Sequence, residues 1–91
     1  KVAQDDKAGV YIGEFNSGAS AVSIPILNEA GVPQISPANT AVGLTTDEPG
    51  ADKGEPAKYY PTGKRTYSRI VPIDTIQAAR RKREIATIEE A

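Results

Sequence analysis

Two short polar loops carry the residues of this chain that are best suited to bind a small ligand. The first loop, Asn16–Gly18, follows an apolar run and leads into a helical stretch. The second loop, Ala38–Thr40, follows another short extended stretch. Hydroxyl, amide and backbone groups give both loops hydrogen-bond donors and acceptors. The two loops are therefore the candidate binding loops.

The first loop has the composition of an anion-binding helix start. Backbone N–H groups at a helix N-terminus attract negative charge, so the Ser17 hydroxyl and the amides of Gly18 and Ala19 could hold a carboxylate. Alternatively, Ser17 or Asn16 caps its own helix. The segment Gly13–Gly18 also has the G-x-x-x-x-G spacing of a phosphate loop, but Ala19 stands where such a loop has its lysine. A phosphate- or nucleotide-binding domain is therefore the weaker alternative.

The second loop offers a different set of groups. Thr40 combines a donor and an acceptor on one short side chain, and the Ala38 carbonyl could accept a hydrogen bond from an ammonium group. The alternative is an ordinary turn in which Asn39 tolerates an unusual backbone conformation. Both interpretations stay open at this point.

The elements around these loops predict an α/β fold with a partial parallel sheet. We expect a strand over Val10–Ile12, a helix over Ala19–Ala30 that ends at Gly31 and Pro33, and a strand over Val32–Ser36. Such a βαβ unit places its two strands in parallel. Ligands of parallel sheets bind at the carboxyl ends of the strands, where both candidate loops fall.

The central helix is predicted to bury one apolar face. Its apolar side chains recur at intervals of four, while its polar side chains suit the solvent side. A proline inside the helix predicts a kink there, or a helix that begins close to it. The residues expected inside are Val22, Ile26 and Ala30, those expected outside are Ser20, Ser23 and Asn28, and the proline is Pro25.

The remaining segments are simpler. Lys1–Lys7 is compatible with the last turns of a helix. Residues 45–65 predict a long surface loop rich in Gly, Pro and charge, which Tyr59 and Tyr60 pack onto the body. A strand over Tyr67–Val71 and a helix from Thr75 follow, with Asp74 as N-cap and Gln77 near a capping-box position. The helix carries a charged tail over residues 80–91.

Composition excludes several kinds of site. The chain has 91 residues and a net charge of −1, and it lacks Cys, His, Trp and Met. Disulfides and soft-metal sites are therefore excluded, no metal site is predicted, and the charge gives no support for nucleic-acid binding. No apolar run approaches the roughly 18 residues of a membrane span. The absence of an initial methionine and of a signal peptide indicates a processed chain or a piece of a longer one.

Three stretches of the sequence resemble one family of binding proteins. YIGEFNSGAS, PILNEAGVPQISPANT and YPTGKRTYSRIVPIDTIQAA are similar, in this order, to periplasmic binding proteins of the branched-chain amino-acid type, the receptors of ABC importers. The resemblance extends to Ala79. It implies that residues 1–79 are a partial N-terminal lobe of the type 1 periplasmic-binding fold, whose ligand lies in the cleft between two lobes.

The resemblance also implies which residues bind. Ser17 corresponds to the serine that binds the ligand carboxylate, and the adjacent Gly18 is a candidate through its backbone amide at the helix start. The loop from Ser36 to Thr40 corresponds to the one that binds the amino and carboxylate groups, with the Ala38 carbonyl and Thr40 as contacts. Since the family commonly has a small residue at the position of Asn39, we expect Asn39 to narrow the pocket or add a polar contact.

The resemblance implies that the protein binds a solute and does not catalyse a reaction. The expected partners are an amino acid or related small solute and, through a full-length parent, an ABC transporter permease. No cofactor is expected. The implied location is periplasmic or extracellular, with lipid anchoring of the parent as an option. A sensor domain of the same fold is a further alternative, and exposed sheet edges predict self-association.

Overall fold

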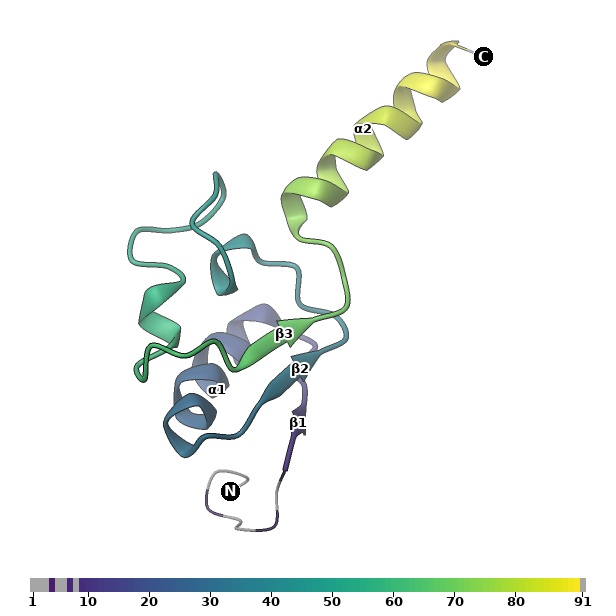
Figure 1. The fold of residues 1–91 in the computed structure, drawn as a ribbon. Coiled ribbons are helices and arrows are strands. Elements are labelled where there is room, and N and C mark those ends of the chain that lie inside the picture. Colours follow the sequence, from purple (N-terminus) through teal and green to yellow (C-terminus); the bar gives the residue numbers. More distant parts are fainter. Residues whose placement is uncertain (1–3, 5–6, 8, 91) are drawn as a thin grey trace.

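Three short strands form a parallel sheet in the order β1-β2-β3 (Figure 1). The computed structural model describes residues 4, 7 and 9–90. The strands are β1 (Tyr11–Ile12), β2 (Gln34–Ser36) and β3 (Tyr67–Arg69), each shorter than the predicted segment. The predicted α/β fold with a parallel βαβ unit is thereby confirmed, whereas the helix expected over Lys1–Lys7 lies largely outside the described residues.

The first helix, α1, runs over Ser17–Ala30. It begins two residues earlier than predicted because the Asn16 side chain accepts a hydrogen bond from the Gly18 amide and caps the helix. It ends as predicted at Gly31, whose φ of 74° suits a residue without a Cβ. The helix passes through Pro25 without a break, so the alternative start near Pro25 is wrong.

The buried face of α1 is not the predicted one. Its inward side chains are Ser20, Ile24, Leu27 and Asn28, which recur at the 3.6-residue helical period. Val22 and Ile26, expected inside, are 66% and 55% exposed, and Ala30 is also exposed. The reversal has a physical reason: each buried polar side chain finds hydrogen-bond partners inside, which removes the usual cost of burial.

Tyrosines build much of the small core. Ile24 of α1 packs with Leu44, Tyr59, Tyr60 and Tyr67. Tyr60 donates its hydroxyl to the Leu44 carbonyl at 2.6 Å, so its polar end is satisfied inside. The prediction that Tyr59 and Tyr60 pack the long loop onto the body is confirmed.

The loop between β2 and β3 is partly ordered into short helical turns. The turn η2 (Val42–Leu44) is fully buried, and η3 (Ala57–Tyr59) packs against α1. The predicted irregular segment 45–65 therefore contains one 3₁₀ turn, which brings Tyr59 to the core.

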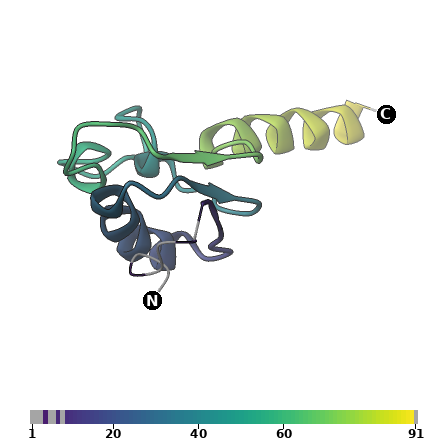
Figure 2. The same ribbon diagram turned by 60° about the horizontal axis from the view of Figure 1, so that its bottom comes forward.

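The second helix, α2, runs over Asp74–Glu90 and leads away from the body (Figures 1 and 2). Every residue from 74 to 89 is exposed. The helix continues without a break across Ala79 and Arg80, so the charged tail belongs to the same element. The Gln77 side chain donates to the Pro72 carbonyl at 2.7 Å. Within the described residues, neither helix is long and apolar enough to cross a membrane.

Candidate functional site

The fold brings the two predicted binding loops together at one edge of the sheet. Ser17 opens α1, and the loop that contains Ala38 and Thr40 leaves the carboxyl end of β2. The two segments touch, since the Ser17 hydroxyl accepts a hydrogen bond from the Ala41 amide at 3.3 Å. Ser17, Ala38 and Thr40 are all partly exposed, so a solute can reach them.

The start of α1 is already capped by its own chain. The Gly18 amide donates to the Asn16 side chain at 2.7 Å, and the Ser20 amide donates to the Asn16 carbonyl at 3.1 Å. The predicted alternative, in which a residue of the loop caps its own helix, therefore applies to Asn16. A ligand carboxylate at this helix start would meet Ser17 and the exposed residue Ala19, and it would compete with Asn16 for the Gly18 amide.

Asn39 points into the core and not toward solvent. It is 0% exposed. Its side-chain oxygen accepts hydrogen bonds from the Ser20 hydroxyl and, at 2.9 Å, from the Tyr67 hydroxyl. Among the described residues, its side-chain nitrogen has no hydrogen-bond partner. The residue does not use a left-handed backbone. In this arrangement Asn39 supports the loop from beneath, and the expected ligand contact would require it to leave the core.

A buried polar network joins the strand ends beneath the loops. The Ser36 hydroxyl accepts from the Asn39 amide at 2.9 Å and donates to the Glu14 carbonyl at 2.7 Å. The Gln34 side chain donates to the Gly13 carbonyl at 3.0 Å. Gln34 and Ser36 are both buried, and their bonds tie the segment after β1 to the segment after β2. The network fixes the relative position of the two candidate loops.

Arg69 holds the second loop from the side of β3. Its guanidinium donates to the carbonyls of Asn39 at 3.2 Å and Ala41 at 2.7 Å, and also to the Thr45 hydroxyl. In the part of the chain that the structure describes, no carboxylate forms an ion pair with Arg69. An unneutralised guanidinium next to the loop favours an anionic ligand over a cationic one.

Two of the residues around this edge have perturbed acidity. Burial raises the pKa of the Tyr67 hydroxyl, which contacts Asn39. The hydrogen bond to Glu14 and burial raise the pKa of Tyr11. Both hydroxyls therefore stay protonated near neutral pH, so they act as hydrogen-bond donors and not as bases.

Sequence inspection missed the polar groups that support the site. Ser20, Gln34 and Arg69 were not among the predicted site residues. The sequence does contain a signal for the burial of Ser20. Ser20, Ile24 and Leu27 share one face of a helix, just as Val22 and Ile26 share another. No local pattern distinguishes Arg69 from a solvated residue at the end of a strand.

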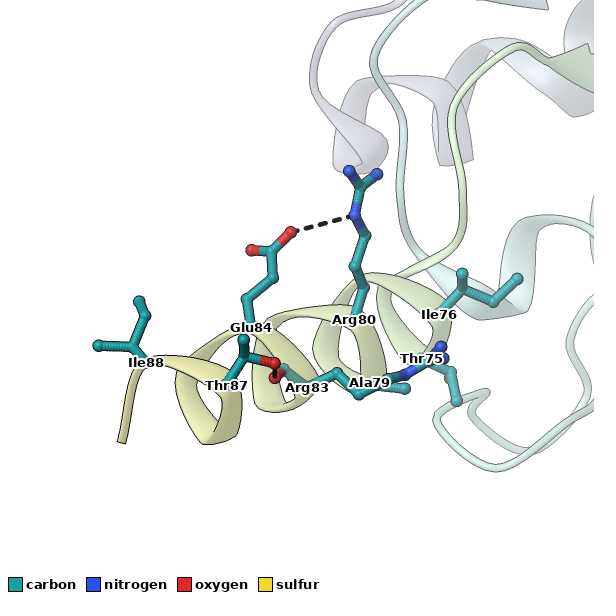
Figure 3. Close-up of a pocket in the computed structure, with 8 residues that line it drawn as sticks. All are labelled: Thr75, Ile76, Ala79, Arg80, Arg83, Glu84, Thr87 and Ile88. Carbon is teal, nitrogen blue, oxygen red and sulfur yellow. Dashed lines mark hydrogen bonds and ion pairs between the residues drawn. The ribbon is translucent and has the colours of Figure 1, made fainter. Parts of the chain in front are cut away.

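A shallow hollow runs along α2 (Figure 3), whose first residue, Asp74, donates its amide to the Thr40 carbonyl at 2.8 Å. A single exposed helix forms it, with an ion pair between Arg80 and Glu84 at 3.2 Å on its wall. Its lining residues are Thr75, Ile76, Ala79, Arg80, Arg83, Glu84, Thr87 and Ile88. None of them belongs to the predicted site, and none of the described residues forms a cluster of metal ligands.

Comparisons with family models, with curated proteins and with solved structures found no match to this chain.

Proposed function

We propose that this chain is part of the first lobe of a solute-binding receptor that serves an ABC importer. The ligand is an amino acid or a similar small solute with a carboxylate, bound at a cleft between two lobes. The chain contributes Ser17, Gly18, Ala38 and Thr40 to one side of that cleft, and Asn39 supports them. The receptor works outside the cytoplasm and meets the permease through the full-length parent.

One observation carries this proposal. The hydrogen bond between the Ser17 hydroxyl and the Ala41 amide sets the start of α1 beside the loop that follows β2. A carboxylate at this point meets a hydroxyl and a helix N-terminus, and the Arg69 guanidinium donates to the Ala41 carbonyl of the adjoining loop at 2.7 Å. The ammonium group of the same solute would face the Ala38 carbonyl and Thr40. These groups can hold a zwitterion by hydrogen bonds, and no bond-making step is involved.

The phosphate-loop alternative receives less support from the geometry. Ser20 occupies the position of the metal-binding hydroxyl in such loops. Here Ser20 is completely buried and hydrogen-bonded to Asn39 and Gln34, so it cannot reach a metal ion. Glu14 adds a negative charge within the loop itself. A phosphate would therefore meet repulsion without a lysine to offset it.

The proposal is tested by following the backbone amide signals of the ¹⁵N-labelled chain during titration. The probes are L-leucine, L-glutamine and acetamide, with inorganic phosphate and ATP for the alternative. We expect the amino acids to shift the signals of Ala19, Thr40 and Ala41, and acetamide to shift them less because it lacks a carboxylate. Shifts that occur with phosphate and ATP but not with amino acids would favour the alternative.

A pair of serine variants supplies the control. Ser17→Ala removes the proposed carboxylate donor, which should weaken amino-acid binding about tenfold, the loss expected for one hydrogen bond to a charged group. Ser68→Ala removes a hydroxyl of similar size from an exposed position on β3 and should leave binding unchanged. Equal affinities for the two variants, or no response to any amino acid, would refute the proposal.

A further inference from the structure

Two arginine side chains meet at Thr45, in the segment between β2 and β3. The Arg65 guanidinium donates a hydrogen bond to the Thr45 carbonyl at 2.5 Å. The Arg69 guanidinium donates to the Thr45 hydroxyl and to two carbonyls of the same segment, at 2.7 and 3.2 Å. Because both guanidinium groups contact one residue, their positive charges lie close together.

The buried residue Tyr60 fixes the position of the Arg65 guanidinium. The guanidinium carbon lies 4.8 Å from the centroid of the Tyr60 ring, where the ring electrons attract its positive charge. Burial raises the pKa of the Tyr60 hydroxyl, while the positive charges of Arg65 and Arg69 oppose this rise. The two charges therefore act on the same hydroxyl, which agrees with their meeting at Thr45.

Neither of these two charges is neutralised by the residues that the structure describes. The ion pair that those residues do form lies on α2. The carboxylates nearest to Thr45 in the sequence, Asp47 and Glu48, pair with neither arginine. Two like charges at short range repel each other, and an anion bound between them offsets this repulsion. Arg65 is exposed and Arg69 is half-buried, so an anion can reach both from solvent.

Unused hydrogen-bond donors accompany the two charges. A guanidinium has five N–H donors in a planar fork. Arg65 donates to Thr45 and interacts with the Tyr60 hydroxyl, while Arg69 donates three hydrogen bonds. Each guanidinium therefore keeps at least two donors that no described residue uses. The Thr45 hydroxyl accepts from Arg69, and its own proton has no acceptor among the described residues.

We propose that Arg65, Arg69 and the Thr45 hydroxyl form a binding site for a phosphate-type dianion, either free phosphate or the terminal group of a phosphate monoester. The two guanidinium charges match the two negative charges of such a group, and their forks suit its terminal oxygens. A single carboxylate matches only one of the charges. The site uses none of the proposed solute contacts, such as Ser17 and Thr40, so this inference does not depend on the proposed receptor function.

The test is titration of the ¹⁵N-labelled 91-residue chain with sodium phosphate at neutral pH and constant ionic strength. We expect saturable shifts of the Thr45 amide signal and of the side-chain N–H signals of Arg65 and Arg69. Acetate, a monoanion, should bind about tenfold more weakly, the loss expected for one contact between charged groups. Glycerol 3-phosphate distinguishes the two sources, because it matches free phosphate only if the site accepts a monoester. Shifts without saturation, equal binding of acetate, or shifts at Ala19 instead of Thr45 would overturn the proposal.

Two arginine variants locate the site. Arg65→Gln should raise the dissociation constant for phosphate about tenfold, because it removes one of the two charges. Arg65 is exposed, so circular dichroism should show that this variant folds normally. Arg81→Gln is the matched control, since it removes the same charge from an exposed position on α2 and should leave phosphate binding unchanged. Unchanged binding by Arg65→Gln, or an equal loss in Arg81→Gln, would refute the assignment of the site.

Discussion

The two helices of this protein are stabilised in opposite ways. α1 has 14 residues and includes Gly18, Pro25 and three serines, which are poor helix formers, yet four of its residues are buried. α2 has 17 residues, many of them good helix formers, and none of its described side chains is buried. Burial can therefore hold a helix of weak propensity in place, while α2 combines strong propensity with tertiary hydrogen bonds near its start, from Asp74 to Thr40 and from Thr75 to Pro49.

The difference between the two helices can be tested by truncating one isoleucine on each of them. Ile24→Ala removes a side chain that is 1% exposed and should lower the free energy of unfolding by about 3–4 kcal/mol. Ile85→Ala on α2, where the side chain is 50% exposed, should lower it by less than about 0.5 kcal/mol. Urea denaturation followed by tyrosine fluorescence measures both. Similar losses for the two variants would show that α2 packs as α1 does.

A second prediction concerns the polar anchor of α1. Asn28 donates to the Lys64 carbonyl and the Thr66 hydroxyl, both at 2.8 Å, and accepts from the amide and hydroxyl of Thr62 at 3.0 and 2.8 Å. Asn28 itself is 1% exposed, and Asn28→Ala removes all four of these hydrogen bonds together with the buried side chain, which should cost about 2–3 kcal/mol. The control, Gln77→Ala on α2, removes one exposed hydrogen bond and should change stability by less than about 0.5 kcal/mol.

Alkaline pH should loosen the tyrosine core that packs against α1. Burial and the hydrogen bond to Glu55 raise the pKa of Tyr59 to about 12. Since an unfolded tyrosine has a pKa of about 10, this group contributes stability that is fully present below pH 10 and lost between about pH 10 and 12. The same bond lowers the pKa of Glu55, so its contribution on the acid side disappears as the pH falls through that lowered value.

Denaturation at a series of pH values checks this prediction. Tyr59→Phe should cost about 1 kcal/mol at neutral pH through the lost hydrogen bond. It should also lower the number of protons released on unfolding by about one, so that the free energy of unfolding falls less steeply between pH 10 and 12. Tyr11→Phe is the comparison: the pKa of Tyr11 is also raised, chiefly by its hydrogen bond to Glu14, but less than that of Tyr59, so this variant should change the slope less. An unchanged slope in Tyr59→Phe would contradict the assigned environment. α2 has no tyrosine and should keep its helicity through this range.

The smallest effect on the body is expected from breaking α2 itself. Ala79→Pro should cost the helix about 3 kcal/mol and reduce helical circular dichroism. The body should lose less than about 0.5 kcal/mol, because two hydrogen bonds that attach the start of α2 precede the substitution. They run from the Asp74 amide to the Thr40 carbonyl at 2.8 Å and from the Thr75 hydroxyl to the Pro49 carbonyl at 3.4 Å. A large fall in the urea midpoint of the tyrosine signal would instead reveal a tertiary role for α2.

Much of the fold follows from local sequence. The βαβ order, the end of α1 at Gly31 and the packing of Tyr59 and Tyr60 were all predicted, because apolar runs, glycine at a helix end and a lone aromatic pair each act locally. The position of Ser17 beside the loop after β2 also follows, since parallel strands bring both loops to one edge.

Tertiary structure decided which residues of these elements face inward. The sequence allows two apolar faces for α1, and the face with Ser20 and Asn28 is buried because partners far along the chain satisfy those groups. Asn39 likewise turns inward to Ser20 and Tyr67, 19 and 28 residues away. Hydrogen bonds from distant segments offset the cost of burying these polar groups, and no local pattern contains that information.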